Sequence, residues 1–225
     1  VDKGGQLLSF LLSHCEQGRP YPPPRAIGAK LDMVAAAMSK PSYKIILGSA
    51  SMARRRILAE MGYEFTVMTA DIDEKSIRKD KPEELVMALA EAKADAIIAR
   101  LLNTGQLQND TDMTLLITAD TLLLAGYSGS HAAVVGSVLV TNLTTGSRRV
   151  TWERAEVYFH EIPDEIIDSL IEEGITFKVA GGLMLEHPLT LPFVEAVIGN
   201  SDTVMGLPTA LTQQFIDEVL QPLKP

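Results

Sequence analysis

Cysteine is almost absent from this chain, which has a single one, Cys15, among its 225 residues. One cysteine cannot form a disulfide within the chain, and so low a count favours a reducing compartment, so we expect a cytoplasmic protein. Long apolar runs are missing too. No stretch reaches 18 apolar residues, which argues against a membrane-spanning helix. No Cys/His cluster has the spacing of a zinc site.

Basic residues are also few compared with acidic ones. The chain has 20 Lys and Arg against 29 Asp and Glu, a net charge of −9, which argues against a nucleic-acid partner. A small phosphorylated substrate stays compatible with this balance, because a few local basic residues suffice to bind it. The apolar fraction of 46% and the charged fraction of 22% are typical of a globular protein, and this length can bury a substantial core.

Residues 1–37 show neither a helical nor a strand hydrophobic period, and they include the stretch "GRPYPPPRAIG". We expect a disordered extension here, with Met33 and Met38 as alternative starts. An organelle-targeting segment is the second interpretation. The folded domain is expected over residues 38–225.

Apolar runs and amphipathic segments alternate along the rest of the chain. Strands are predicted at 43–49, 63–74 and 115–118, and helices at 53–62, 81–102, 163–174 and 209–220. Two β runs within 132–162 flank Thr144-Thr145-Gly146, a hairpin signal. Because αβ alternation comes first and a hairpin follows, the pattern predicts an α/β fold with a mixed, twisted sheet flanked by helices.

The stretch "LLITADTLLLAGYSGSHAAVV", residues 115–135, departs from this alternation. A strand with Asp120 at its C-terminal end and an apolar burst at 122–124 lead almost directly into the β run at Ala132. An α/β protein usually has a helix between such strands, and a parallel crossover needs about a dozen residues or more. The sequence therefore predicts that a helix is missing here.

The segment "ILGSASMARRRIL" has the features of a phosphate site. The hydroxyls of Ser49 and Ser51 lie at the expected start of a helix, where free backbone N–H groups attract anions. The consecutive arginines Arg54, Arg55 and Arg56 add charge suited to bidentate phosphate contacts. The spacing is not that of a Walker loop. The alternative is a solvated basic helix face.

Acidic residues and one lysine form the second group of candidates. "ADIDE" places Asp71, Asp73 and Glu74 after a strand, where carboxylates could hold Mg²⁺ or Mn²⁺, or could form an acidic surface turn. Lys93 interrupts the apolar stripe of Leu89 and Ile97, so it either neutralises phosphate or extends to the surface.

Asp120 is the strongest single candidate for a functional residue. An acid that follows a buried strand lies where open α/β sheets bind ligands, and it could hold a metal or polarise a water molecule. The alternative is a capping role in the next turn. The histidines His131, His160 and His187 lack ligand spacing and are interpreted as structural.

These blocks, in this order, resemble the Maf family of nucleoside triphosphate pyrophosphatases, from about Tyr43 to Leu220. "LGSASMARRRILAEMG" is similar to the family's Ser-x-Ser-Pro-Arg-Arg opening, and "ADIDE", "AEAKA", "TADT", "AGGLMLEH" and "VMGLP" match its later blocks. The details look most like plant members. The resemblance implies a Maf or inosine triphosphatase-like fold, a homodimer, and metal-dependent (Mg²⁺ or Mn²⁺) hydrolysis of a nucleoside triphosphate to a monophosphate and pyrophosphate. It also implies a role in removing non-standard or surplus nucleotides.

The resemblance also assigns roles residue by residue. Asp120 matches the family's proton acceptor, and Glu74 matches the acid that acts as a metal or water ligand; both are expected to hold the metal. Lys93 matches the helix lysine and is expected to be catalytic together with Asp120 and Glu74. Arg54 matches an arginine of the opening loop. With Ser49, Ser51 and Arg55, Arg54 is expected to bind substrate.

The positions expected to contact the base do not all agree with the same branch of the family. Met52 replaces the family's proline, and Ala53 stands where the dTTP/UTP branch has arginine and the 7-methyl-GTP branch has tryptophan. Thr121 agrees with the first branch, whereas Glu186 agrees with the second. Thr121 and Glu186 are both expected to contact substrate, and the preferred base does not follow from the sequence.

The family has a Gly-Lys-Pro-like turn and a helix where this chain has "AGYSGS" after Leu124. An alternatively spliced form or a gene-model error would explain the deletion. The missing lysine would help to neutralise phosphate, so we predict a weakened enzyme. The alternative function is a nucleotide-binding regulatory protein that has lost catalysis.

Overall fold

The computed structural model describes residues 43–106, 113–124, 128–174, 182 and 184–221. All of them belong to one compact unit, Ser42–Pro225. The extension expected at 1–37 and the domain boundary expected at 38 lie outside the described residues.

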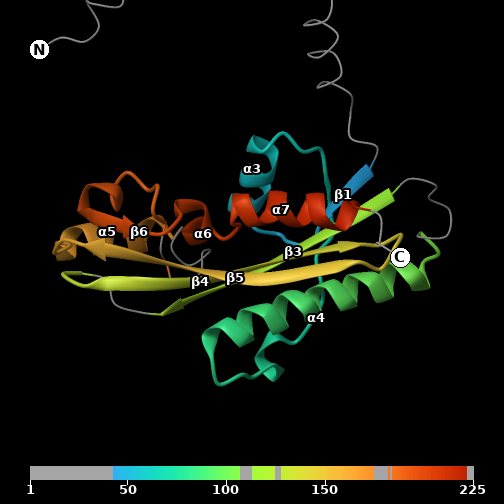
Figure 1. Ribbon diagram of the computed structural model, residues 1–225. Coiled ribbons are helices and arrows are strands. Elements are labelled where there is room, and N and C mark those ends of the chain that lie inside the picture. Colours follow the sequence, from blue (N-terminus) through green and yellow to red (C-terminus); the bar gives the residue numbers. More distant parts are fainter. Residues whose placement is uncertain (1–42, 107–112, 125–127, 175–181, 183, 222–225) are drawn as a thin grey trace, which may run out of the picture. The chain divides into compact units, whose positions relative to one another are not determined.

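A six-stranded mixed sheet is the centre of the fold (Figure 1). Its order is β2-β1-β3-β4-β5-β6; β2, β1 and β3 run parallel, and β4, β5 and β6 are added antiparallel. The strands are β1 (Tyr43–Leu47), β2 (Thr66–Val67), β3 (Met113–Leu124), β4 (His131–Asn142), β5 (Arg148–Phe159) and β6 (Val194–Ile198). This arrangement confirms the predicted α/β fold with a mixed sheet.

Helices cover both faces of this sheet (Figure 1). The helix α4 lies along one face, and α3, α6 and α7 lie on the other. The helices are α3 (Met52–Glu60), α4 (Pro82–Asn103), α5 (Asp164–Glu173), α6 (Ser201–Met205) and α7 (Thr209–Leu220), with 3₁₀ turns η1 (Glu74–Ser76) and η4 (Leu191–Phe193). Within the described residues, no helix combines the length and the apolarity needed to cross a membrane.

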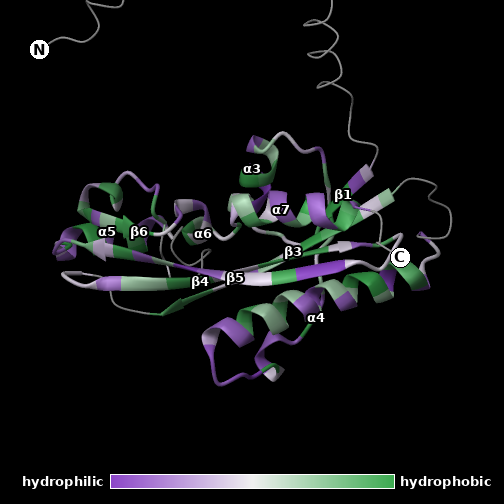
Figure 2. Cartoon of the chain, in the orientation of Figure 1, coloured by the Kyte–Doolittle hydropathy of each residue, from purple (hydrophilic) through white to green (hydrophobic). Residues whose placement is uncertain are grey.

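The alternation of side chains along β3 builds a separate core on each face. Leu115, Ile117 and Ala119 pack with α3 and α7, whereas Leu116 packs with α4. Both faces are therefore apolar, and Figure 2 shows hydrophobic residues along most of β3. This two-sided burial explains why the strand is a continuous apolar run in the sequence.

The connection after Asp120 differs from the predicted one. β3 does not stop at Thr118 but continues to Leu124, and it pairs antiparallel with β4 from Leu115↔Asn142 to Leu124↔Ala133. The premise that these strands need a parallel crossover was therefore wrong, because antiparallel neighbours can be joined by a short turn. The sheet is therefore continuous at the place where the sequence predicts a missing helix.

The predicted strand over 63–74 is also shorter than expected. Only Thr66 and Val67 pair with β1, through Ile46↔Thr66 and Leu47↔Val67. The acidic segment that follows turns away into η1, where the Asp73 carboxylate accepts a hydrogen bond from the backbone N–H of Lys75 at 3.1 Å. Asp73 is therefore a cap, which is the structural alternative to a metal ligand.

The hairpin around Thr144-Thr145-Gly146 is confirmed as the β4–β5 turn. The Asn142 side chain accepts from the backbone N–H groups of Thr144 and Thr145, and Gly146 has a φ of 75°. The four predicted helices are confirmed as well, within one to two residues at each end.

Gly48 follows β1 at a point where the backbone passes very close to β3 and α4. A Cβ atom there would lie 2.5 Å from Cγ2 of Thr118 and 2.9 Å from Cδ1 of Ile97. We expect Gly48→Ala to lower the free energy of unfolding by about 1–3 kcal/mol, as overpacking does, measured by urea denaturation. Gly136→Ala is the matched control, because its Cβ would have nothing nearer than 3.5 Å and its stability should stay close to that of the parent.

Candidate active site

The candidate site lies at the C-terminal ends of the parallel strands. β1 ends at Leu47, paired with Ile117, whereas β3 runs on through Ala119, Asp120 and Thr121. Within the part of the chain that the structure describes, this stretch of β3 therefore has no strand on its β1 side. Open α/β sheets bind ligands at such carboxyl ends, where loops and helix N-termini converge.

Lys93 joins the two acids of the predicted site. Its ammonium nitrogen lies 2.5 Å from Oδ1 of Asp120 and 3.0 Å from Oε1 of Glu74. The Lys93 side chain is only 12% exposed, so it does not extend to the surface but faces this acidic pair. The structure thus brings together the three residues expected to be catalytic.

Two buried hydroxyls hold α4 against the strands at this point. The Thr118 hydroxyl donates to the carbonyl of Ala90 at 2.8 Å, and the Ser137 hydroxyl donates to the carbonyl of Val86 at 2.7 Å. The Ser137 oxygen also accepts from the backbone N–H of Asp120 at 3.3 Å. These contacts position Lys93 and Asp120 relative to each other. Sequence reasoning missed both hydroxyls, whose only signal was a polar residue inside an apolar strand.

Asp120 is buried, with 9% exposure, and its environment opposes ionisation. Burial raises the pKa of this carboxyl above its ordinary value, and Lys93 and Arg54 offset only part of the rise. The negative charge of Glu74 acts in the same direction as burial. A carboxylate that gains a proton more readily than usual is suited to accept one during a reaction.

Arg54 is enclosed by acceptors from three parts of the chain. Its Nε donates to the carbonyl of Gly206 at 2.8 Å, and its Nη1 donates to Ser49 Oγ at 3.2 Å and to the carbonyl of Ala119 at 2.9 Å. Its Nη2 donates to Thr121 Oγ1 at 3.0 Å. Burial lowers the pKa of this guanidinium, while the charges of Asp120 and Glu74 raise it. Two of the predicted substrate residues, Ser49 and Thr121, are therefore tied to Arg54.

The other residues of the opening loop have separate surroundings. Ser51 is the N-cap of α3, where its hydroxyl accepts from the backbone N–H of Arg54 at 3.4 Å. Arg56 lies on the exposed side of α3 and forms ion pairs with Glu60 at 2.8 Å and with Glu186 at 3.1 Å. Glu186 is thereby placed beside α3 but outside the Lys93 cluster.

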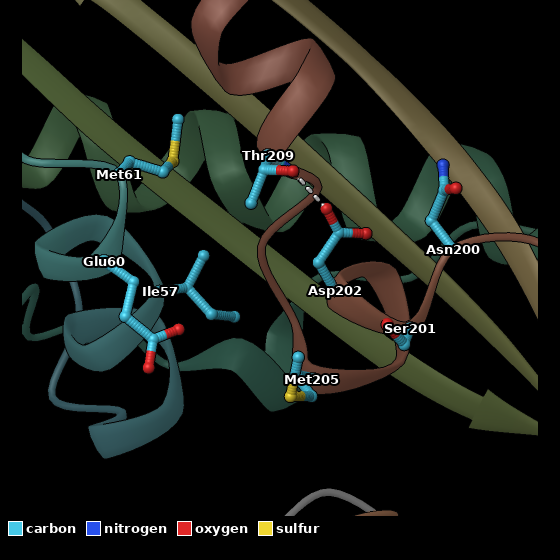
Figure 3. A pocket seen from close by; sticks show the side chains of 8 residues that line it. All are labelled: Ile57, Glu60, Met61, Asn200, Ser201, Asp202, Met205 and Thr209. Atoms are coloured by element: carbon cyan, nitrogen blue, oxygen red, sulfur yellow. Dashed lines mark hydrogen bonds between the residues drawn. The ribbon is translucent and has the colours of Figure 1, made fainter. Parts of the chain in front are cut away.

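A cavity of about 410 Å³ opens between α3 and α6, and Figure 3 shows the side chains around it. Its walls consist of Ile57, Glu60, Met61, Asn200, Ser201, Asp202, Met205 and Thr209. The Asp202 carboxylate is occupied there as a cap of α7, accepting from the backbone N–H and the hydroxyl of Thr209. No predicted site residue lines this cavity, and its lining contains carboxylates but no cation.

The donor set fits a divalent metal that arrives with a phosphorylated ligand. Within the described ranges, no group of three or more His, Cys, Asp or Glu side chains could hold a metal. Glu74 and Asp120 offer two carboxylates, and Mg²⁺ is usually bound by one or two carboxylates together with substrate phosphates and water. Two histidines have structural contacts: His131 stacks on Tyr158, and His187 pairs with Glu173 at 2.8 Å.

The fold and this cluster define an α/β protein with an acid–lysine site at the edge of its parallel strands. The Maf-like protein family matches residues 44–219, so the chain belongs to the Maf family. It is similar to a 7-methyl-GTP pyrophosphatase of Dictyostelium discoideum, at 33% identity over 80% of this chain and 99% of the relative. A nucleoside triphosphate pyrophosphatase of Trichormus variabilis is 31% identical over 78% and 93%, respectively. A dTTP/UTP pyrophosphatase of Desulforamulus reducens is 30% identical over 73% and 90%.

The alignment with the Dictyostelium relative also bears on the predicted deletion. It extends over 200 positions but covers 80% of this 225-residue chain, which is about 180 residues. About 20 positions of the relative therefore have no counterpart here. That length would accommodate a turn and a short helix, which is the size of the segment that the sequence predicts to be missing after Leu124.

Proposed function

We propose that this chain hydrolyses nucleoside triphosphates to a monophosphate and pyrophosphate, with Mg²⁺ or Mn²⁺ as the metal, and removes surplus or non-standard nucleotides. The observation that carries the proposal is the contact of Lys93 with both Asp120 and Glu74 at the carboxyl ends of the parallel strands. The names of the Dictyostelium, Trichormus and Desulforamulus relatives support the same reaction class.

Asp120 acts as the proton acceptor in this proposal. Its raised pKa, its burial and its fixed backbone suit a base that takes a proton from the attacking water molecule. Lys93 holds the carboxylate in place and brings a positive charge to the edge where phosphates would bind. A metal ion held by Glu74 and Asp120 would supply further charge for the phosphate oxygens and for the water.

The phosphates would lie against the start of α3. The hydroxyls of Ser49 and Ser51 accept from the backbone N–H groups of Ser51 and Arg54, so each still has its own O–H to donate to a phosphate, and the helix end has positive partial charge. Because α3 begins beside the end of β1, an anion bound to this turn would lie close to the lysine and the acids.

The alternative function is a regulatory protein that binds nucleotides without hydrolysing them. It is a second candidate because about 20 positions of the Dictyostelium relative have no counterpart in this chain. One experiment separates the two. We expect pyrophosphate release from at least one nucleotide in a panel that includes 7-methyl-GTP, dTTP and UTP, assayed with Mg²⁺ and with Mn²⁺. Binding of a triphosphate with no release from any member of the panel would reject the enzymatic proposal and favour the regulatory one.

A further inference from the structure

The short turn between α6 and α7, residues 206–208, brings a backbone carbonyl to the guanidinium of Arg54. The carbonyl of Gly206 accepts from Nε of Arg54 at 2.8 Å. A Cβ atom on Gly206 would lie 3.1 Å from Oγ1 of Thr121 and 3.3 Å from Nε of Arg54, so the backbone of the turn passes directly beside both groups. Arg54 also donates to the hydroxyls of Thr121 and Ser49. The position of this α6–α7 turn therefore affects two residues that are expected to contact substrate.

Asp202 closes the turn with all three of its oxygen atoms. Its backbone carbonyl accepts from the N–H groups of Gly206 at 2.9 Å and Leu207 at 3.0 Å. Oδ1 of its carboxylate accepts from the backbone N–H of Thr203 at 2.8 Å. Oδ2 accepts from the backbone N–H of Thr209 at 2.8 Å and from the Thr209 hydroxyl, and Figure 3 shows these two side chains facing each other across the turn. A carboxylate is a strong acceptor for such donors, so these bonds fix the turn at both ends.

Packing fixes only part of this turn. Leu207 is buried in the core with α3 and α7, whereas the cavity of about 410 Å³ borders the turn at Asp202, Met205 and Thr209 (Figure 3). Side chains beside a cavity lack contacts on that side, so packing constrains them less than it constrains a filled core. The hydrogen bonds of Asp202 are therefore needed to keep the Gly206 carbonyl at Arg54.

The turn acts on one face of β3 and the acid–lysine cluster lies on the other. Side chains alternate along a strand, so Thr121 shares the α3 and α7 face with Ala119. Asp120 points to the opposite face, where it contacts Lys93 of α4. A shift of the turn should thus disturb the residues that are expected to contact substrate more than it disturbs the expected proton acceptor.

We propose that Asp202 is a positioning residue for substrate binding. It holds the α6–α7 turn so that the Gly206 carbonyl fixes the guanidinium of Arg54. That guanidinium keeps the hydroxyls of Thr121 and Ser49 in place for the substrate. For the nature of the substrate, a nucleoside triphosphate, this inference rests on the proposed function.

Three substitutions remove the contact between Asp202 and Thr209 to different degrees. Asparagine has nearly the shape of aspartate, but it has an NH₂ group in place of one oxygen and cannot accept on both sides as Asp202 does. Thr209→Val removes the hydroxyl donor and keeps the backbone N–H, whereas Thr209→Ser keeps both donors. The expected effect is therefore largest for Asp202→Asn, smaller for Thr209→Val and absent for Thr209→Ser.

The first test measures how fast the Nε–H proton of Arg54 exchanges with water, by NMR of the ¹⁵N-labelled full chain. Arg54→Lys identifies the signal by removing it. We expect exchange to become about tenfold faster or more in Asp202→Asn, because the Gly206 carbonyl is no longer held against this N–H, and about threefold faster in Thr209→Val. Thr209→Ser should equal the parent. An unchanged rate in Asp202→Asn would overturn the proposal; if that variant does not fold, a Thr209→Val rate equal to that of Thr209→Ser would do so.

The second test measures pyrophosphate release with the best nucleotide of the panel. We expect Asp202→Asn to raise KM about tenfold or more and to leave kcat within about threefold of the parent. Ile216→Val is the matched control, because it loosens the buried side of α7 without contacting the turn, and its KM should stay at the parent value. An unchanged KM in Asp202→Asn, or an equal rise in Ile216→Val, would contradict the positioning role. If the parent hydrolyses no nucleotide, the proposed function fails, and the exchange rate of Arg54 still decides whether Asp202 positions it.

Discussion

Replacing Asp120 with asparagine is expected to lower kcat for pyrophosphate release by about a thousandfold, within the range lost when a positioned general base is removed. Asparagine keeps the shape of the side chain and can still accept a hydrogen bond from Lys93, but it cannot take a proton. Steady-state assays with the best nucleotide of the panel measure the effect. Equal activity in the two proteins would remove Asp120 from the mechanism.

Asp95→Asn is the matched control for this substitution. Asp95 is an exposed aspartate on the same helix as Lys93, and it pairs with Arg148 at 2.8 Å. Its loss removes one negative charge and one surface ion pair, which contributes little to stability. We expect kcat to stay within about twofold of the parent, so a large fall in Asp120→Asn alone would be specific to the site.

The pH dependence of stability gives an independent check on Asp120. Its pKa is raised in the folded protein, so the fold favours the protonated acid, and this stabilisation is lost as the pH rises through the folded pKa. At neutral pH the ionised carboxylate is then a net cost that asparagine does not have. We expect Asp120→Asn to resist urea at least as well as the parent at pH 7, with the difference shrinking in acid. If Asp120→Asn is clearly less stable than the parent at pH 7, the pKa of Asp120 is not raised in the folded protein and this prediction is wrong.

The cluster of Lys93, Asp120 and Glu74 could be predicted from sequence because each member leaves a local signal. Lys93 interrupts an apolar helical stripe, and Asp120 ends the most apolar part of a strand; the structure then brings both into contact with Glu74. The family resemblance raised the expectation for all three. Local periodicity and strand ends are the features that a single sequence reveals best.

The hydrogen-bond partners of Arg54 could not be predicted in this way. Two of its acceptors are the carbonyls of Ala119 and Gly206, which are backbone atoms 65 and 152 residues away and have no signature in the sequence. The direction of the strands could not be predicted from the sequence either, because an apolar run that is buried on both faces has the same pattern whether its neighbouring strand is parallel or antiparallel. The error about the connection after Leu124 has this origin, since the expected crossover presupposed parallel strands.

Inserting the segment that is predicted to be missing after Leu124 is expected to raise kcat/KM for the preferred triphosphate by about tenfold or more. The physical reason is the lysine that the family resemblance implies there, since a further cation beside the phosphates would neutralise charge that develops during hydrolysis. The insertion would replace residues 125–130 with the corresponding segment of the Dictyostelium relative. β3 and β4 would keep their antiparallel pairing up to Leu124↔Ala133, so the graft lengthens a hairpin end and leaves the sheet unchanged.

Two controls separate the effect of the lysine from the effect of length. A Gly/Ser segment of equal length tests whether a longer connection alone changes activity, and the graft with its lysine replaced by glutamine tests the charge. We expect neither control to exceed the parent chain by more than about twofold, and all three proteins should melt close to one another because loop length has a small entropic cost. If the complete graft folds and remains no more active than the parent, the shortened hairpin is not what limits this enzyme. A gain shared by the glutamine graft would instead assign the effect to the helix and not to its lysine.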